Sequence, residues 1–324
     1  MRPTSLTRGR KAAILGAGLP EGSIRRLPER IPDPEFLGGQ GLSMDEPREN
    51  PHSCDLCGSN RADPVLEKHG AHYLSCRDCG FIYADLSAEE GARNNYEHFD
   101  GAIARYVAKA YSAKKQAVYG RLLRGFRPYR KLNRILEVGC NVGGFLYRAR
   151  IEGWHALGIE PSAECAAFGR DRYGLDIIPK VLEEAELPEG SFDVAYSNAV
   201  FEHLPRPSPV FAALARALRP GGLAFIDTVN WDCYTRRFVG KDWKLLDPRS
   251  HLCLYTPATL RRHCEKAGLE VLRIATHGVR FRRNDAEKLR GLARFREELR
   301  KLPWSIASRR RLQGDSIAVW ARKG

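Results

Sequence analysis

The chain has 324 residues, of which 43% are hydrophobic, and it carries a formal net charge of +14 at pH 7. This is enough apolar sequence for one sizeable core and a small accessory unit, and the longest apolar runs have the length of strands, which argues against a membrane-spanning helix. Nine cysteines without a secretory apolar segment at the front predict a reducing, cytoplasmic compartment rather than a disulfide scaffold.

The positive charge is concentrated in two stretches. Residues 91–134 hold 11 basic and 2 acidic residues, and residues 230–324 hold 23 basic and 10 acidic ones. An anionic substrate or surface is one interpretation, and solvated arginine-rich helices are the other. Residues 51–90 carry 3 basic and 7 acidic residues and are therefore a poor arm for binding phosphate.

Residues 1–50 are rich in Pro, Gly and Arg without sustained periodicity, so we expect a disordered tail there. The stretch KAAILGAGLP imitates the start of a dinucleotide fold, but Pro20 falls inside the helix that should follow. The two methionines are Met1 and Met44. Translation from Met44 is a hypothesis that would leave out residues 1–43, and the intact mass of the natively expressed protein tests it.

A doubled cysteine motif follows in residues 51–90. Two C-x-x-C pairs are separated by eighteen residues, and each is followed by a glycine, Gly58 or Gly80. A pair of thiolates on a tight turn presents both sulfurs to one ion, and two such turns complete a tetrahedral site. Because all four ligands come from protein, the sequence predicts a structural Zn²⁺ ribbon rather than a catalytic metal. The predicted ligands are Cys54, Cys57, Cys76 and Cys79.

Residues 91–133 show helical periodicity with basic side chains on the other faces, which predicts one or two connecting or lid helices. From residue 134 to residue 324, strand-like and helix-like segments alternate. This alternation predicts an α/β fold with a largely parallel sheet that is covered on both faces. The expected strands are RILEVGC, HALGIEP, DIIPKVL, FDVAYSNA, GGLAFIDTV, EVLRIATH and SIAVWAR, and the expected helices lie near 143–152, 163–173, 207–219 and 257–267.

The first of these strands ends in a glycine turn, ILEVGCNVGGFL. It fits E-x-G-x-x-x-G, with Glu137, Gly139 and Gly143, better than the dinucleotide pattern G-x-G-x-x-G. Asn141 stands where a glycine would be usual, and Asn tolerates a left-handed backbone best after glycine. Glu137 would repel a pyrophosphate, so it suits a ligand with a cationic amino-acid end.

Acidic residues also end the next two strands. Glu160, about twenty residues after the glycine turn, is placed to accept both hydroxyls of a ribose. The run LEEAELP precedes the fourth expected strand, and an acidic side chain there can accept a hydrogen bond from an adenine amine.

The motifs ILEVGCNVGGFL, GIEPS, LEEAELPEGSFDVAYSNAVFEHL and ALRPGGLAFIDTVN occur in an order and spacing that resembles class I S-adenosylmethionine-dependent methyltransferases. The resemblance covers residues 134–324 and implies a Rossmann-like, seven-stranded, mostly parallel sheet whose last strand is antiparallel. It implies that Gly139 and Gly143 lie against the methionine moiety and that Glu160 holds the ribose. It also places Glu183 near the adenine and Asn198 opposite the sulfonium.

Together with the cysteine motif, the chain is similar to a bacterial subgroup of small-molecule and sugar methyltransferases with an N-terminal zinc ribbon. Residues 230–271 are similar to the lid and sixth strand of that subgroup. The Asn/Asp-Pro-Pro-aromatic motif of enzymes that methylate base amines is absent, since the place reads SNAVFEHL. This argues against methylation of adenine or cytosine amines in DNA.

Methyl transfer to a hydroxyl or carbon acid needs alignment and a base. His203, beside Glu202, is the first candidate, and its alternative is a structural histidine before Pro205. His251 is the second candidate. Tyr234, Trp243 and Tyr255 are further candidates for the pocket wall, with ordinary packing as their alternative.

We therefore expect S-adenosylmethionine-dependent methylation of O, N or C in a small, anionic metabolite, sugar or glycan precursor. An rRNA-type RNA methyltransferase is the main alternative, and its binding surface would be the basic lid over residues 280–301 and the basic loop over residues 308–314. A fold retained only as a scaffold is the third possibility, and the intact Glu137 and Glu160 disfavour it.

Overall fold

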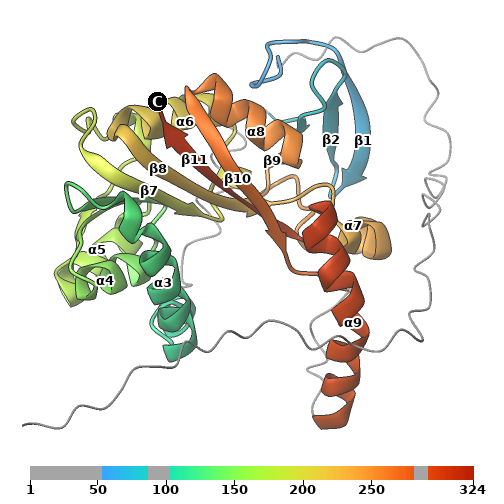
Figure 1. Cartoon of the computed structure of the whole chain (residues 1–324). Helices are drawn as coiled ribbons and strands as arrows, with labels where there is room; N and C mark the ends of the chain where they lie inside the picture. Colours follow the sequence, from blue (N-terminus) through green and yellow to red (C-terminus); the bar gives the residue numbers. More distant parts are fainter. Residues whose placement is uncertain (1–52, 87–102, 281–290) are drawn as a thin grey trace, which may run out of the picture. The chain divides into compact units, whose positions relative to one another are not determined.

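The computed structural model describes residues 53–86, 103–280 and 291–324 (Figure 1). All of the described residues fall within one compact unit. The expected disordered tail and Met44 lie outside the described residues. None of the helices in the described part is long and apolar enough to cross a bilayer.

The central sheet has seven strands in the order β10-β11-β8-β7-β4-β5-β6, and only β11 runs antiparallel to its neighbours. This confirms the predicted sheet with an antiparallel last strand. The third expected strand was too long, because it stops at Ile178 before Pro179, which has no N–H to donate to a ladder. The strands are β4 (Arg134–Val138), β5 (His155–Ile159), β6 (Asp176–Ile178), β7 (Phe192–Asn198), β8 (Leu218–Val229), β10 (Leu269–His277) and β11 (Ser316–Lys323).

Alternating strand residues bury two faces of this sheet. Ile135 and Val194 pack with α3 (Ala113–Phe126) and α4 (Gly144–Ile151). Their neighbours along the chain, including Leu136 and Ala195, pack on the opposite face with α6 (Pro207–Ala217) and α8 (Pro257–Lys266). Helices cover both faces because the side chains of β4 and β7 are buried at nearly every position, on one face or the other.

Local capping chemistry fixes the helix ends close to where the sequence predicts them. In α5 (Ala163–Tyr173), the Ser162 side chain accepts from the Cys165 N–H, and Gly174 ends the helix with φ 59°. In α8, Thr256 and Thr259 form a reciprocal capping box, and Pro257 occupies the first turn.

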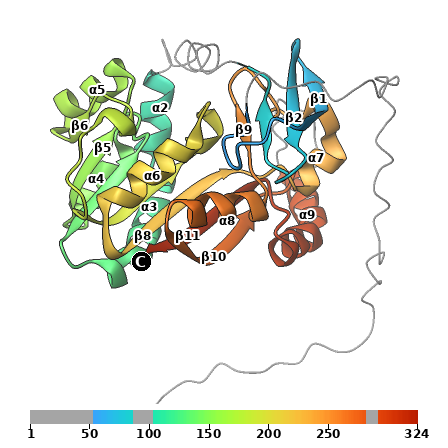
Figure 2. The ribbon, with the colours of Figure 1, turned by 90° about the horizontal axis from the view of Figure 1, so that it is seen from above.

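The cysteine-rich segment forms a second sheet of four strands in the order β1-β2-β3-β9 (Figure 2). Three strands come from this segment, namely β1 (Ala62–Lys68), β2 (Ala71–Cys76) and β3 (Ile82–Ala84). The fourth, β9 (Cys253–Leu254), comes from the region expected to belong to the catalytic domain and pairs antiparallel with β3. Residues from both expected domains therefore share one sheet.

Further helices and 3-10 turns complete the described part of the fold. α9 remains helical to Arg311, so the expected loop over residues 308–314 was wrong for its first four residues. The remaining elements are α2 (Ile103–Ala110), α7 (Tyr234–Val239), α9 (Gly291–Arg311) and the 3-10 turns η1 (Arg127–Tyr129), η2 (Leu182–Glu184), η3 (Phe201–His203) and η4 (Gly240–Asp242).

Candidate functional site

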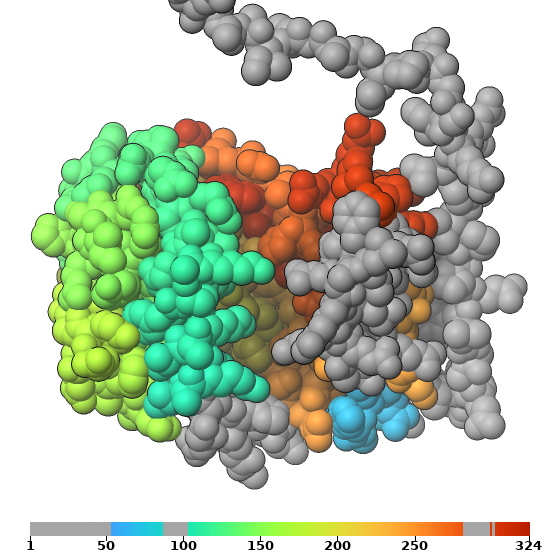
Figure 3. All heavy atoms as spheres, turned by 90° about the horizontal axis from the view of Figure 1, so that it is seen from below, coloured from blue at the N-terminus to red at the C-terminus, as the bar shows by residue number. Residues whose placement is uncertain are grey.

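A cavity of about 970 Å³ opens at the carboxyl ends of β4, β5 and β7. Helices α2 and α3 contribute one of its walls, and the face that they border is hollowed in Figure 3. Ligands of α/β proteins bind at this end of a parallel sheet, and cavities of about 300–1,000 Å³ hold small-molecule ligands. The size and position of the cavity fit a nucleoside-sized cofactor together with a small acceptor.

The glycine turn after β4 forms the floor of this cavity. Gly139 has φ 73°, and a Cβ there would lie 2.3 Å from Cγ2 of Val200, so a larger residue does not fit. Asn141 takes the left-handed conformation with φ 48°, as the sequence predicted. Its N–H donates to Oε2 of Glu160 over 2.7 Å, which fixes the turn against the end of β5.

Gly143 has a role that the sequence did not predict. It caps α4 with φ 79° and is not among the residues that line the cavity, whereas Gly144 is. A Cβ on Gly143 would lie 2.4 Å from Cδ1 of Leu175. The structure therefore gives Gly143 a place in the turn and in the packing behind it, and its contact with the methionine moiety stays a prediction.

Gly143→Ala is expected to lower the free energy of unfolding by about 2–4 kcal/mol, because it adds an overlap with Leu175 to a left-handed backbone. Gly70→Ala is the matched control, since Gly70 has φ 77° and nothing within 4 Å of its added Cβ. The control should lose only about 1–2 kcal/mol. Urea unfolding of both variants gives the comparison, and equal losses would contradict the packing role.

Two buried carboxyl groups dominate the electrostatics of the cavity. Burial raises the pKa of Glu137 well above its ordinary value, and the charge of Glu160 raises it further. Oε2 of Glu137 has no hydrogen-bond partner among the described residues. Glu160 accepts from the N–H groups of Asn141 and Ser162, one on each oxygen, while burial raises its pKa. A buried carboxyl without a partner calls for a cationic or donating group of a ligand.

Glu183 and Asn198 also line the cavity, Glu183 from η2 and Asn198 from the last residue of β7. Both are exposed to its interior. Ala199, next to Asn198, has φ 56°, a strained conformation for alanine that is typical of functional turns. Behind it, burial and the charge of Glu202 raise the pKa of Asp227 to about 7.

The structure brings the two predicted catalytic histidines together. The ring centroids of His203 and His251 are 4.8 Å apart, and both residues line the cavity. Nδ1 of His203 lies 2.7 Å from the carbonyl oxygen of Ser250, and Nδ1 of His251 lies 2.8 Å from that of Leu245. Because a carbonyl oxygen can only accept, these contacts place a proton on Nδ1 of each ring. Burial lowers the pKa of His251, which favours its neutral form.

The three aromatic candidates for the pocket wall were wrong. Tyr234, Trp243 and Tyr255 are buried, with at most 3% of their surface exposed, and none lines the cavity that the described residues enclose. Tyr255 donates instead to the carbonyl oxygen of Phe201 over 3.3 Å. The spacing of aromatic residues along the sequence could not distinguish side chains that line the cavity from side chains buried in the core.

The sequence analysis did not assign any basic residue to the cavity wall. Lys115 and Tyr119 from α3 line the cavity although their segment was expected only to connect or cover. The excess of basic residues in 91–134 was a signal for this role. The cationic lining residues are Arg105, Lys109, Lys115 and Arg206.

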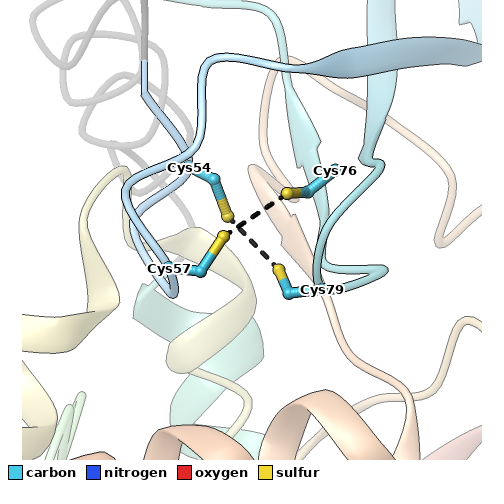
Figure 4. Close-up of side chains that lie close together, drawn as sticks. All are labelled: Cys54, Cys57, Cys76 and Cys79. Carbon is cyan, nitrogen blue, oxygen red and sulfur yellow. Dashed lines mark hydrogen bonds between the residues drawn. The ribbon is translucent and has the colours of Figure 1, made fainter.

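The four cysteines predicted to bind metal converge from two loops (Figure 4). Sγ of Cys54 is 3.5 Å from Sγ of Cys79, and Sγ of Cys57 is 3.5 Å from Sγ of Cys76. Sulfurs of a tetrahedral zinc site lie about 3.8 Å apart, whereas a disulfide requires about 2 Å. The positive φ angles of 78° and 71° at Gly58 and Gly80 confirm the expected tight turns. This chemistry fits one closed, four-thiolate zinc site.

The cysteine loops are tied to the helices beside the cavity. Asp55 accepts from the Ser208 N–H over 2.8 Å, and its carbonyl oxygen accepts from Nζ of Lys266 over 3.0 Å. On the other side, the Tyr73 hydroxyl donates to the carbonyl oxygen of His251 over 2.7 Å. The small sheet therefore holds the backbone at a cavity histidine.

A family model for a methyltransferase domain matches residues 87–274. Two curated relatives, each named ubiquinone biosynthesis O-methyltransferase, are 31% identical in Aromatoleum aromaticum and 32% identical in Aeromonas salmonicida. The matches cover 42% and 43% of this chain and 64% and 63% of the relatives, so the chain spans less than two thirds of their length.

One similar solved structure comes from Thermotoga maritima and is described as a SAM-dependent methyltransferase and possible histamine N-methyltransferase. Its TM-score is 0.48 at 17% identity, and the match covers 71% of this chain and 98% of that one.

Proposed function

Because the chain belongs to the methyltransferase domain family, we propose that it transfers a methyl group from S-adenosylmethionine to an oxygen of a small molecule. The observation that carries this proposal is the cavity itself, where Glu137, Asn141 and Glu160 meet beside two histidines. The names of the two curated relatives support an oxygen acceptor on a quinone-like ring.

The residues present fit S-adenosylmethionine. Oε2 of Glu137, buried and without a partner among the described residues, would accept from the ammonium group of the methionine end. Glu160 would hold the ribose with the remaining lone pairs of its two oxygens, and Glu183 would accept from the adenine amine. Asn198 would face the sulfonium at the end of β7. When bound, the cofactor supplies an electrophilic methyl group.

The histidines would prepare the acceptor. With the proton on Nδ1, Nε2 of His203 can take the hydroxyl proton while the acceptor oxygen takes the methyl group. The carbonyl oxygen of Ser250 orients the ring and stabilises the imidazolium that forms. Lys109, Lys115 and Arg206 in the lining support an anionic acceptor. These cations, in a cavity sized for small ligands, favour a metabolite over RNA.

We also propose a structural Zn²⁺ ion at Cys54, Cys57, Cys76 and Cys79, in a protein of the cytoplasm. The S–S distances and the two glycine turns support it. All four ligand positions are supplied by protein, so the ion would organise the small sheet without taking part in chemistry.

The test of the function is transfer of a labelled methyl group from S-adenosylmethionine into a fractionated cell extract by the full-length protein. Label is expected in the small-molecule fraction. The labelled methyl ether isolated from that fraction identifies the acceptor. Label in RNA that ribonuclease removes would overturn the small-molecule proposal. An extract incubated with the Glu160→Ala variant is the control for other methyltransferases.

The affinity for S-adenosylmethionine is expected to rise as the pH is raised through the elevated pKa of Glu137, by up to tenfold per unit. Burial and the charge of Glu160 raise this pKa, although Lys115 opposes them, and an ammonium group favours the ionised form. Calorimetric titration over this range measures the slope. Glu137→Gln should bind more weakly with a flattened slope, and an unchanged slope would assign the proton to another group.

A further inference from the structure

Glu202, His203 and His251 form a second group of metal-ligating side chains, distinct from the cysteines. One ligand atom from each lies within 4.8 Å of the other two. Glu202 and His203 come from η3, directly after β7, and His251 comes from the segment before β9. Ligand atoms around one first-row metal ion are roughly 3–3.5 Å apart, so modest side-chain movement would close the group on an ion.

Each member of this group has a hydrogen-bond partner that fixes its orientation. The rings of His203 and His251 contact carbonyl oxygens through Nδ1, over 2.7 and 2.8 Å. Oε2 of Glu202 accepts from the hydroxyl of Thr228 over 2.7 Å. Metal-binding histidines typically donate their second N–H to a carbonyl or carboxylate, and metal-binding carboxylates are themselves hydrogen-bonded. The hydrogen-bond partners that orient the ligands of such a site are therefore already in place.

Burial also gives this group a need for partners. Glu202 is only 2% exposed, and a buried carboxyl group requires hydrogen-bond or ion partners. Thr228 supplies one of them, and a bound ion would supply another.

We propose that Glu202, His203 and His251 bind a divalent first-row transition-metal ion at the wall of the cavity. Two imidazoles and one carboxylate suit Zn²⁺, Fe²⁺, Co²⁺ or Mn²⁺ and leave coordination positions open, unlike the closed set of four thiolates. His203 and His251 line the cavity, so the open positions face it. The role of the ion, but not its binding, rests on the proposed function: with Nε2 of His203 coordinated, the ion would replace that nitrogen as the activator of the acceptor hydroxyl by lowering its pKa, and the proton would pass to solvent water.

The test uses Mn²⁺ as the probe and the full-length, zinc-loaded protein. Mn²⁺ prefers nitrogen and oxygen ligands to thiolates, and water bound to it speeds the relaxation of water protons. We expect one bound Mn²⁺ per chain with enhanced relaxation, which reports an open site. Glu202→Gln, His203→Gln and His251→Gln should each weaken binding at least tenfold. His155→Gln, an exposed histidine at the start of β5, is the matched control and should bind as the parent does.

Binding of labelled S-adenosylmethionine to each variant separates the metal site from the fold and from the proposed function. Loss of Mn²⁺ with retained cofactor binding supports the site. Absence of enhanced relaxation in the parent protein, or equal binding by all variants, would overturn it even if methyl transfer occurs. Mn²⁺ binding without cofactor binding would support the metal site and contradict the proposed function instead.

Discussion

Replacing Glu160 with alanine is expected to weaken S-adenosylmethionine binding by at least about a hundredfold. Two hydrogen bonds from ribose hydroxyls to a buried carboxylate are each worth about 1.5–3 kcal/mol, and tenfold in affinity is about 1.4 kcal/mol. The change also removes the acceptor for the N–H groups of Asn141 and Ser162, so the glycine turn loses its anchor. Calorimetric titration with the cofactor measures the loss.

Glu164→Ala is the matched control for this experiment. Glu164 lies four residues further on in the first turn of α5, is exposed and does not line the cavity. It should bind the cofactor as the parent does. Urea unfolding of both variants separates loss of affinity from loss of fold. Unchanged affinity in Glu160→Ala with a normal unfolding transition would remove the carboxylate from the cofactor site.

The second large effect is expected in Cys76→Ser, which should lose one equivalent of bound zinc and about a hundredfold in turnover. The cysteines are remote from the cofactor residues, but β3 pairs with β9, and the Ala84 N–H donates to the carbonyl oxygen of Leu252 over 2.8 Å. Loosening this sheet frees His251, the residue directly before Leu252. A displacement of about 1 Å at a catalytic group costs about a hundredfold in rate.

Two measurements distinguish this explanation from general unfolding. Cofactor affinity should change little in Cys76→Ser, because Glu137 lies on β4 and Glu160 directly follows β5, both in the larger sheet. Cys165→Ser replaces a buried cysteine outside the metal group and should keep its zinc. Zinc content is measured by mass spectrometry of the purified proteins. Full turnover by a zinc-free Cys76→Ser protein would show that the small sheet does not position the histidine.

The sequence by itself determined the architecture of the larger sheet and the chemistry of its glycine turn. Runs such as RILEV hold apolar residues at adjacent positions, Ile135 and Leu136, which is the pattern of a strand buried on both faces of a sheet. The left-handed turn at Asn141 and the cysteine knuckles were also readable, because they depend on neighbouring residues only.

Only the tertiary structure decided which distant residues share the cavity. Pairing of Tyr83 with Cys253 joins two segments that the sequence separates into different domains, and it brings His251 beside His203. The place of Lys115 in the cavity wall and that of Tyr255 in the core also depend on contacts between distant parts of the chain. Periodicity and spacing record the local backbone, whereas contacts between residues far apart along the chain are selected by packing and burial, which no local pattern contains.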